Sequence, residues 1–319
     1  MKASTLVTGG LGFIGSHLVD RLLSENKRVI VIDDCSTGSP ENLAHHRGNP
    51  DLEIAIAKVS DCQRLAEILS RVESIYHLAA VVGVDLVMKS GIQTIQNNLH
   101  ETDVILQAAS QAHVPLLFAS TSEVYGKSQK EAFSEEDDLL IGPPHLSRWS
   151  YACSKLMDEF LVLSYAQEKQ LPVRIVRLFN TVGPRQTGKY GMVLPRFIQA
   201  ARAGKPIRIF GDGTQTRCFC FVKDTVEALY RLQSTPGALS QVFNVGSTEE
   251  VTINELARTV IQLLDSKSTI EFLPYDQAYT AGFQDMLRRK PVVDKLERAT
   301  GFKPSTSLKE IILKTAAAF

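Results

Sequence analysis

Two periodicities alternate along the chain: short apolar runs, and longer stretches in which apolar residues return every three or four positions. The runs are typical of buried strands, and the three-to-four spacing is typical of helices. The runs predict strands at residues 5–7, 28–32, 53–57, 74–80, 114–119, 171–178, 205–210 and 242–246. The periodic stretches predict helices at 13–23, 62–72, 97–113, 151–167, 192–203, 222–232 and 256–264. Strands that alternate with helices predict an α/β fold built on a parallel sheet.

Three glycines lie between the first predicted strand and the first predicted helix. Gly9, Gly12 and Gly15 have the spacing that permits a tight turn, close approach of the main chain to a pyrophosphate, and close packing of helix on strand. The helix N-terminus adds free N–H groups and the positive end of its dipole. Asp33 and Asp34 end the second strand about twenty residues later, where an acid binds a ribose 2′-hydroxyl. A carboxylate there repels a 2′-phosphate, so the motif predicts NAD rather than NADP on a Rossmann-type doubly wound sheet; a glycine turn without a ligand is the alternative.

Further cofactor contacts are expected where later strands end. Thr37 and Gly38 lie in a polar loop that can cover the adenosine ribose. Asp61 follows the third strand and is a candidate partner for the adenine amino group, although it can equally cap the helix predicted at 62–72. His77 lies inside the fourth strand and is interpreted as a packed core residue. That strand ends in residues that let a cofactor come close: Leu78, Ala79 and Ala80.

A tyrosine and a lysine at helical spacing follow the strand predicted at 114–119. Tyr151 and Lys155 are four residues apart, so they share one face of a helix. An ammonium beside a phenol favours the phenolate and lowers the pKa of the tyrosine, which makes it usable as a base. Thr121, at the carboxyl end of the strand, can add a hydrogen bond to the same reacting hydroxyl. These side chains predict a site that removes a proton from a hydroxyl group.

Composition excludes two classes of partner. The 319 residues carry 35 Lys and Arg against 35 Asp and Glu, so no excess of charge favours nucleic acid or an anionic membrane. No apolar stretch approaches the ~20 residues of a membrane-spanning helix, and the chain enters its first strand without an export signal.

Five scattered cysteines fit a reducing compartment, so we expect the cytoplasm. Cys218 and Cys220 are expected on one face of a strand and not at a metal, since no further ligand completes a tetrahedral set.

With these motifs the chain resembles the extended short-chain dehydrogenase/reductases, in particular the NAD-dependent nucleotide-sugar epimerases, dehydratases and decarboxylases. The resemblance covers almost the full length and rests on segments 9–15, 77–80, 151–155, 179–185 and 210–217. It implies that tightly held NAD oxidises a sugar C4 hydroxyl with Thr121, Tyr151 and Lys155 as the catalytic set. It also implies an NAD-binding domain at 1–178, rejoined by 219–246, and a smaller α/β substrate lobe at 179–218 and 247–319.

The motifs and the resemblance together assign binding roles to individual residues. For NAD they give Gly9, Gly12, Phe13, Ile14, Gly15, Asp33, Asp34, Thr37, Gly38, Asp61, Leu78, Ala79, Ala80, Asn98, Tyr151 and Lys155. For a UDP-sugar they give Ser122, Asn180, Arg185, Arg217 and Arg289. Apolar helices near 98–113 and 151–167 pair in this group as a four-helix dimer interface, so a homodimer is expected.

Shorter segments indicate the branch of the family. Residues 120–126 resemble UDP-glucuronate decarboxylases, in which the acid at the position of Glu123 takes part in the chemistry. Residues 148–153 are similar to the apiose/xylose synthase and the decarboxylase of lipid A aminoarabinose synthesis, whose active-site arginine matches Arg289. Residues 183–191 are more similar to epimerases. The predicted activity is decarboxylation of UDP-glucuronate to UDP-xylose or its 4-keto form. The alternatives are a UDP-sugar 4-epimerase that acts on UDP-glucose or UDP-glucuronate, and a non-catalytic NAD-binding regulator.

Overall fold

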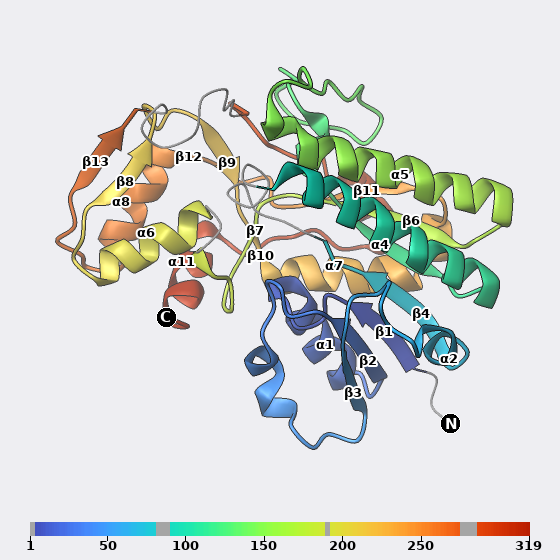
Figure 1. Ribbon diagram of the computed structural model, residues 1–319. Helices are drawn as coiled ribbons and strands as arrows, with labels where there is room; N and C mark the ends of the chain where they lie inside the picture. Colours follow the sequence, from blue (N-terminus) through green and yellow to red (C-terminus); the bar gives the residue numbers. More distant parts are fainter. Residues whose placement is uncertain (1–3, 81–89, 189–191, 275–285) are drawn as a thin grey trace.

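A sheet of seven parallel strands forms the centre of the molecule (Figure 1). The computed structural model describes residues 4–80, 90–188, 192–274 and 286–319. The strand order is β11-β6-β5-β4-β1-β2-β3. The strands are β1 Ser4–Thr8, β2 Arg28–Asp33, β3 Leu52–Ile56, β4 Val72–His77, β5 Leu116–Thr121, β6 Val173–Leu178 and β11 Val242–Val245. The order reverses between β1 and β4, and open parallel sheets bind ligands outside the carboxyl ends of the strands at such a point.

Side chains alternate between the two faces of this sheet. Leu6 and Val7 are both fully buried, yet they belong to different apolar clusters. Val7 packs on the face covered by α1 (Phe13–Ser24) and α7 (Val222–Ser234). Leu6 packs on the other face, which is covered by α2 Leu65–Leu69, α4 Gly91–Ala112 and α5 Ser150–Lys169 (Figure 1). Burial on both faces explains why the strands read as continuous apolar runs.

A smaller group of strands and helices lies to one side of the sheet (Figure 1). Here β8 (Ile207–Phe210) pairs in parallel with β13 (Ile270–Leu273). In the same group β9 (Thr216–Cys218) pairs antiparallel with β12 (Glu250–Thr252). Three helices pack against one another beside these strands: α6 Val193–Arg202, α8 Ile253–Leu263 and α11 Leu308–Ala316. A capping box of Thr252 and Glu255 starts α8, as the sequence pattern at this point predicts.

Short segments complete the chain and join the two groups. Strand β7 (Thr181–Val182) pairs with β10 (Cys220–Phe221). Helix α10 (Asp294–Thr300) packs against α7 and β11. The 3₁₀ turns are η1 Pro40–His46, η2 Ser122–Tyr125, η3 Ser147–Trp149 and η5 Pro236–Ala238. Turn η2 directly follows Thr121 at the end of β5 and contains Glu123. Turn η3 directly precedes α5, which carries Tyr151 and Lys155.

Two local predictions are wrong. The helix predicted at 62–72 is only the short α2, whose N-cap is Arg64, so Asp61 does not cap it. The chain enters β4 at Val72, which leaves no room for a longer helix. Cys218 and Cys220 do not share one strand, because the chain changes partners between them: β9 pairs with β12, whereas β10 pairs with β7.

The α/β fold with a parallel doubly wound sheet is confirmed. After passing through part of the smaller group, the chain returns to the sheet: α7 packs on α1 and β11 pairs with β6. This return lies within the segment 219–246 expected to rejoin the first domain, while the domain boundaries themselves stay a prediction. Among the described residues, no helix combines the length and the apolar character needed to cross a membrane.

Candidate active site

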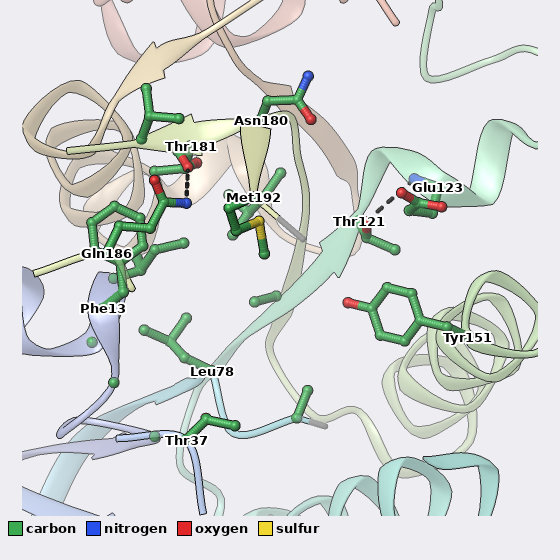
Figure 2. A pocket seen from close by; sticks show the side chains of 18 of the residues that line it. Phe13, Thr37, Leu78, Thr121, Glu123, Tyr151, Asn180, Thr181, Gln186 and Met192 are labelled. Carbon is green, nitrogen blue, oxygen red and sulfur yellow. Dashed lines mark hydrogen bonds between the residues drawn. The ribbon is translucent and has the colours of Figure 1, made fainter. Parts of the chain in front are cut away.

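A cavity of about 470 Å³ lies between the carboxyl ends of the sheet strands and the smaller group. Figure 2 shows Tyr151, Thr121 and Glu123 in one part of it and Phe13, Thr37 and Leu78 in another. Most of the predicted site residues line it: Gly9, Gly12, Phe13, Ile14, Gly15, Asp33, Asp34, Thr37, Leu78, Ala79, Ala80, Asn98, Thr121, Ser122, Glu123, Tyr151, Asn180, Arg217 and Arg289. The predicted residues outside its lining are Gly38, Asp61, Lys155 and Arg185.

The glycine turn is shaped for an anion. Gly9 has φ +71°, a left-handed conformation that favours glycine, and the Gly12 N–H donates to the Gly9 carbonyl oxygen at 3.1 Å. A Cβ atom on Gly15 would lie 2.1 Å from that same carbonyl oxygen. No side chain caps the N-terminus of α1, so its first-turn N–H groups point at the cavity as donors for a ligand. The turn therefore fits a pyrophosphate.

Asp33 braces this turn as well as lining the cavity. Its Oδ2 accepts the Leu11 N–H at 2.9 Å and its Oδ1 accepts the Cys35 N–H at 2.8 Å. Burial raises the pKa of Asp33, and these backbone hydrogen bonds oppose the rise. Asp34 makes a more local contact, because its Oδ1 accepts the Ser36 N–H at 2.9 Å. Both acids line the cavity, and their binding of a ribose stays a prediction.

Glu101 lines the cavity at the end expected for adenine, where the sequence analysis placed Asp61. Asp61 is exposed, whereas Lys58 and Val59, at the end of β3, line the cavity. Glu101 on α4 is fixed by Ser60, whose N–H and hydroxyl donate to it at 3.0 and 2.6 Å. The contact is between residues forty-one positions apart, which no local pattern reports.

Tyr151 and Thr121 meet as predicted. Thr121 Oγ1 accepts the Glu123 N–H at 3.2 Å, so its own proton can be donated to the Tyr151 oxygen. Burial raises the pKa of Tyr151 and the charge of Glu123 raises it further, while the Thr121 hydrogen bond lowers it. The net direction is upward, which differs from the lowered pKa predicted from Lys155.

Burial is the largest cause of this rise, and the Lys155 ammonium is paired with another group. Its Nζ lies 3.2 Å from the Asp158 carboxylate, and the two side chains are 2% and 0% exposed. Nζ also lies 3.9 Å from the centre of the Phe118 ring. Burial lowers the pKa of Lys155, and Asp158 opposes this. The ammonium is thus paired beneath the cavity wall instead of facing the phenol alone.

Glu123 lies between two guanidinium groups. It forms ion pairs with Arg148 and, at 2.6 Å, with Arg289. Burial alone would raise the pKa of Glu123, but Arg148 and Arg289 outweigh it and hold the pKa at about 2. Two cations and one anion leave this cluster with one net positive charge. It can therefore accept one further carboxylate.

The remaining predicted substrate residues divide into two sets. Asn180 lines the cavity, and its Nδ2 is buried with no hydrogen-bond partner among the described residues (Figure 2). Arg217 lines it too and donates to the Thr216 and Met286 carbonyl oxygens at 2.7 and 2.8 Å. Arg185 points elsewhere and pairs at 2.8 Å with Asp20, which also accepts from His45 and His46 at 2.9 Å each.

Two features escaped the sequence analysis. Arg148 received no role beyond the resemblance of segment 148–153, although its place three residues before Tyr151 puts both on the side of the chain that faces the cavity. Arg196 received no role from the sequence, yet it lines the cavity with its guanidinium 4.3 Å from the centre of the Phe210 ring. The contact between Arg196 and Phe210 joins α6 to β8, and only the folded chain reveals it.

Comparison with known proteins gives concordant matches. Residues 5–246 match the NAD dependent epimerase/dehydratase family. Over 316 residues the chain is 40% identical to the UDP-N-acetyl-alpha-D-glucosaminuronate decarboxylase of Bacillus cytotoxicus, covering 99% of this chain and 97% of that protein. It is 37% identical over 305 residues to UDP-glucuronic acid decarboxylase 2 of Arabidopsis thaliana, covering 96% of this chain and 65% of that protein. The structure is similar to the UDP-glucuronic acid 4-epimerase of Bacillus cereus in complex with UDP-glucuronic acid and NAD, with a TM-score of 0.89, 28% identity and coverage of 99% and 98%.

The glycine turn generates a direct test of cofactor binding. Replacing Gly15 by Ala is expected to weaken NAD binding at least about tenfold, because the added Cβ must push the Gly9 carbonyl out of the turn. Isothermal titration and the NAD content of the purified protein measure the loss. Gly237→Ala is the matched control, since no atom lies within 4 Å of its added Cβ. Equal affinities in the two variants would contradict the assignment of the turn.

Proposed function

The chain belongs to the NAD dependent epimerase/dehydratase family, as its motifs predict, and we propose that it removes carbon dioxide from a UDP-linked hexuronic acid. The observation that carries this proposal is the buried Glu123, Arg148 and Arg289 cluster next to Tyr151. A cluster with one net positive charge suits the carboxylate that a hexuronic acid carries at C6. The activities named for the two decarboxylase relatives support the same reading.

NAD is the cofactor, and the cavity offers groups that fit it. Gly9, Gly12 and Gly15 make room for the pyrophosphate at the start of α1, and Asp33 and Asp34 would hold a ribose. When bound, NAD takes a hydride from the sugar C4 and can return it later. The chain itself must supply the base, the carboxylate site and the orientation of the sugar.

Tyr151 is the base for the C4 hydroxyl. Its phenolate accepts the hydroxyl proton as C4 is oxidised, and Thr121 donates a hydrogen bond to the Tyr151 oxygen. Asn180 supplies a donor without a partner among the described residues, which can orient a sugar oxygen. The roles of Tyr151, Thr121 and Lys155 follow the resemblance and the geometry together.

Oxidation at C4 makes the sugar a β-keto acid. The C5–C6 bond then breaks, its electron pair passes into a C4–C5 enolate, and carbon dioxide leaves as a neutral molecule. A proton must then be added at C5. Glu123 stays ionised at neutral pH because its pKa is about 2, so it cannot serve there as a stored proton. Its role in this scheme is to offset part of the positive charge of Arg148 and Arg289. The C6 carboxylate is then bound, but not so tightly that its loss as carbon dioxide is prevented.

Four-helix dimerisation is a further part of the proposal. Helices α4 and α5 pack side by side (Figure 1). Apolar side chains on both helices remain exposed. Their exposed fractions are 75% for Ile92, 38% for Ile95, 53% for Met157 and 61% for Phe160. A second copy of the same pair of helices would cover them. We also place the protein in the cytoplasm, which suits five cysteines that all remain free thiols.

A product assay tests the activity. The purified protein is incubated with UDP-glucuronate, UDP-N-acetylglucosaminuronate and UDP-glucose, and the products are separated by mass. Decarboxylation is expected for at least one of the two acids, seen as loss of carbon dioxide, with UDP-glucose left at its original mass. Conversion to isomers of unchanged mass would support the 4-epimerase instead. No conversion of any sugar, with NAD bound, would support the non-catalytic regulator.

Glu123→Gln is expected to lower carbon dioxide release at least about 100-fold while C4 oxidation persists, so that NADH accumulates. The amide cannot offset the charge of Arg148 and Arg289, which then hold the substrate carboxylate too firmly. Product mass and NADH absorbance are measured on the same samples. Glu136→Gln is the control, because Glu136 is 83% exposed and lies outside the cavity lining. Unchanged decarboxylation in Glu123→Gln would remove Glu123 from the mechanism.

Phe160→Glu is expected to convert a dimer into a monomer, because it places a charge in the middle of the apolar α4–α5 surface. Light scattering coupled to gel filtration gives the mass. Phe272→Glu provides the control, since Phe272 is 55% exposed on β13 in the smaller group. A wild-type monomer, or a Phe160→Glu dimer, would contradict the proposed interface.

A further inference from the structure

Asp158 is a buried carboxylate to which the reaction outlined above gives no task. It lies on α5 three residues after Lys155 and is 0% exposed. The Lys155 Nζ lies 3.2 Å from its Oδ2, and Thr102 of α4 is a second polar neighbour, which lowers the pKa of Asp158. The carboxylate is therefore enclosed between two helices, directly beneath the wall of the cavity.

Burial makes this pair obligatory. Removing one partner of a buried ion pair leaves an uncompensated charge, which is strongly destabilising. Lys155 is only 2% exposed, and its other close neighbour is the face of the Phe118 ring at 3.9 Å. The ring stabilises a cation weakly compared with a carboxylate. Asp158 is thus the main group that keeps the Lys155 ammonium charged in this position.

The other titratable groups around the pair are already committed. Glu159 on α5 is held by Arg177 at 2.8 Å and by the Ser120 hydroxyl. His77 on β4 donates to or accepts from Thr8 at 2.8 Å, and burial lowers its pKa to about 3, so it is neutral. On η2 and η3, Glu123 and Arg148 pair with each other. Among the described residues, Asp158 is the carboxylate that forms an ion pair with Lys155.

We propose that Asp158 is a positioning residue: it holds the Lys155 ammonium beneath the cavity wall and, through that ion pair, sets the pH range in which Tyr151 can accept a proton. The inference rests on the proposed function, because it gives Tyr151 and Lys155 the roles stated there. It adds a second buried charge pair to that of Glu123 and its arginines.

The direction of the effect follows from the charges. The Asp158 carboxylate raises the pKa of Lys155, since it stabilises the ammonium. It also raises the pKa of Tyr151, since it disfavours a phenolate nearby. Activity requires an ionised Tyr151 and a charged Lys155, so the pH profile of activity is bounded by their two pKa values. The lower of the two sets the acid limb, and the higher sets the alkaline limb. Removing the charge of Asp158 lowers both values, and the whole pH profile moves to lower pH.

Asp158→Asn tests this with little change in side-chain shape. The pH dependence of NADH formation from UDP-sugars is measured for wild type, Asp158→Asn and Asp158→Glu. Asp158→Asn is expected to shift the profile by about one unit to lower pH, whereas Asp158→Glu, which keeps the charge, should retain the wild-type position. Asp158→Ser is measured alongside, so the test does not depend on one variant folding, and circular dichroism reports the fold of each.

A second readout needs no turnover. Ultraviolet difference titration, with Tyr151→Phe as the reference for subtraction, follows ionisation of the Tyr151 phenol directly, and it should occur at lower pH in Asp158→Asn. Asp103→Asn is the matched control, because Asp103 lies on α4 and bonds the Tyr165 hydroxyl of α5 at 3.2 Å outside the cavity lining.

The outcomes separate the two claims. Loss of activity in Asp158→Asn with an unshifted profile and an unshifted phenol titration would overturn the inference, since it would show a structural role alone. A shift of equal size in Asp103→Asn would overturn it as well. If the wild-type protein oxidises none of the UDP-sugars, the proposed function fails, and the inference fails with it.

Discussion

The requirement that buried charges be paired governs the architecture of this site. Glu123 forms ion pairs with Arg148 and Arg289. Lys155 is paired with Asp158, and Glu159 is paired with Arg177. Each pair joins elements that are separate in the chain or adjacent turns of one helix, so pairing also fixes the positions of those elements. Tyr151 lies among these charges, and its readiness to act as a base depends on their balance. The chemistry and the packing of this region therefore have one physical origin.

The same balance indicates the kind of substrate. A 4-epimerase needs a base, a hydride acceptor and room for the sugar to turn, and it needs a carboxylate site only when its substrate is a uronic acid. The cluster of Arg148, Arg289 and Glu123 adds something specific, because its single net positive charge matches an acid group on the sugar. A site for a neutral sugar would gain nothing from burying two arginines. The architecture thus favours a substrate that is itself an acid.

Local sequence patterns predicted the parts of this site that depend on neighbours in the chain. Gly9, Gly12 and Gly15 define a turn, Asp33 ends a strand, and Tyr151 shares a helix with Lys155, so spacing alone places them. Contacts between distant segments were not predictable in this way. Asp61 was predicted to contact adenine but lies outside the cavity lining, whereas Glu101 of α4 lines the cavity and accepts hydrogen bonds from Ser60. Arg185 was assigned to the substrate, yet Asp20 of α1 draws it elsewhere. The pKa of Tyr151 was expected to fall, yet burial raises it, and the spacing of Tyr151 and Lys155 does not report burial.

The contact between Arg289 and Glu123 joins residues 166 positions apart. During synthesis on the ribosome, the segment that forms the glycine turn and the tyrosine helix emerges long before Arg289 is added to the chain. A nascent chain can thus acquire its cofactor half early, since domains generally fold as units as they leave the ribosome. The carboxylate site is completed only after Arg289 has been added to the chain, so cleavage of the C5–C6 bond requires this later segment to be folded in place.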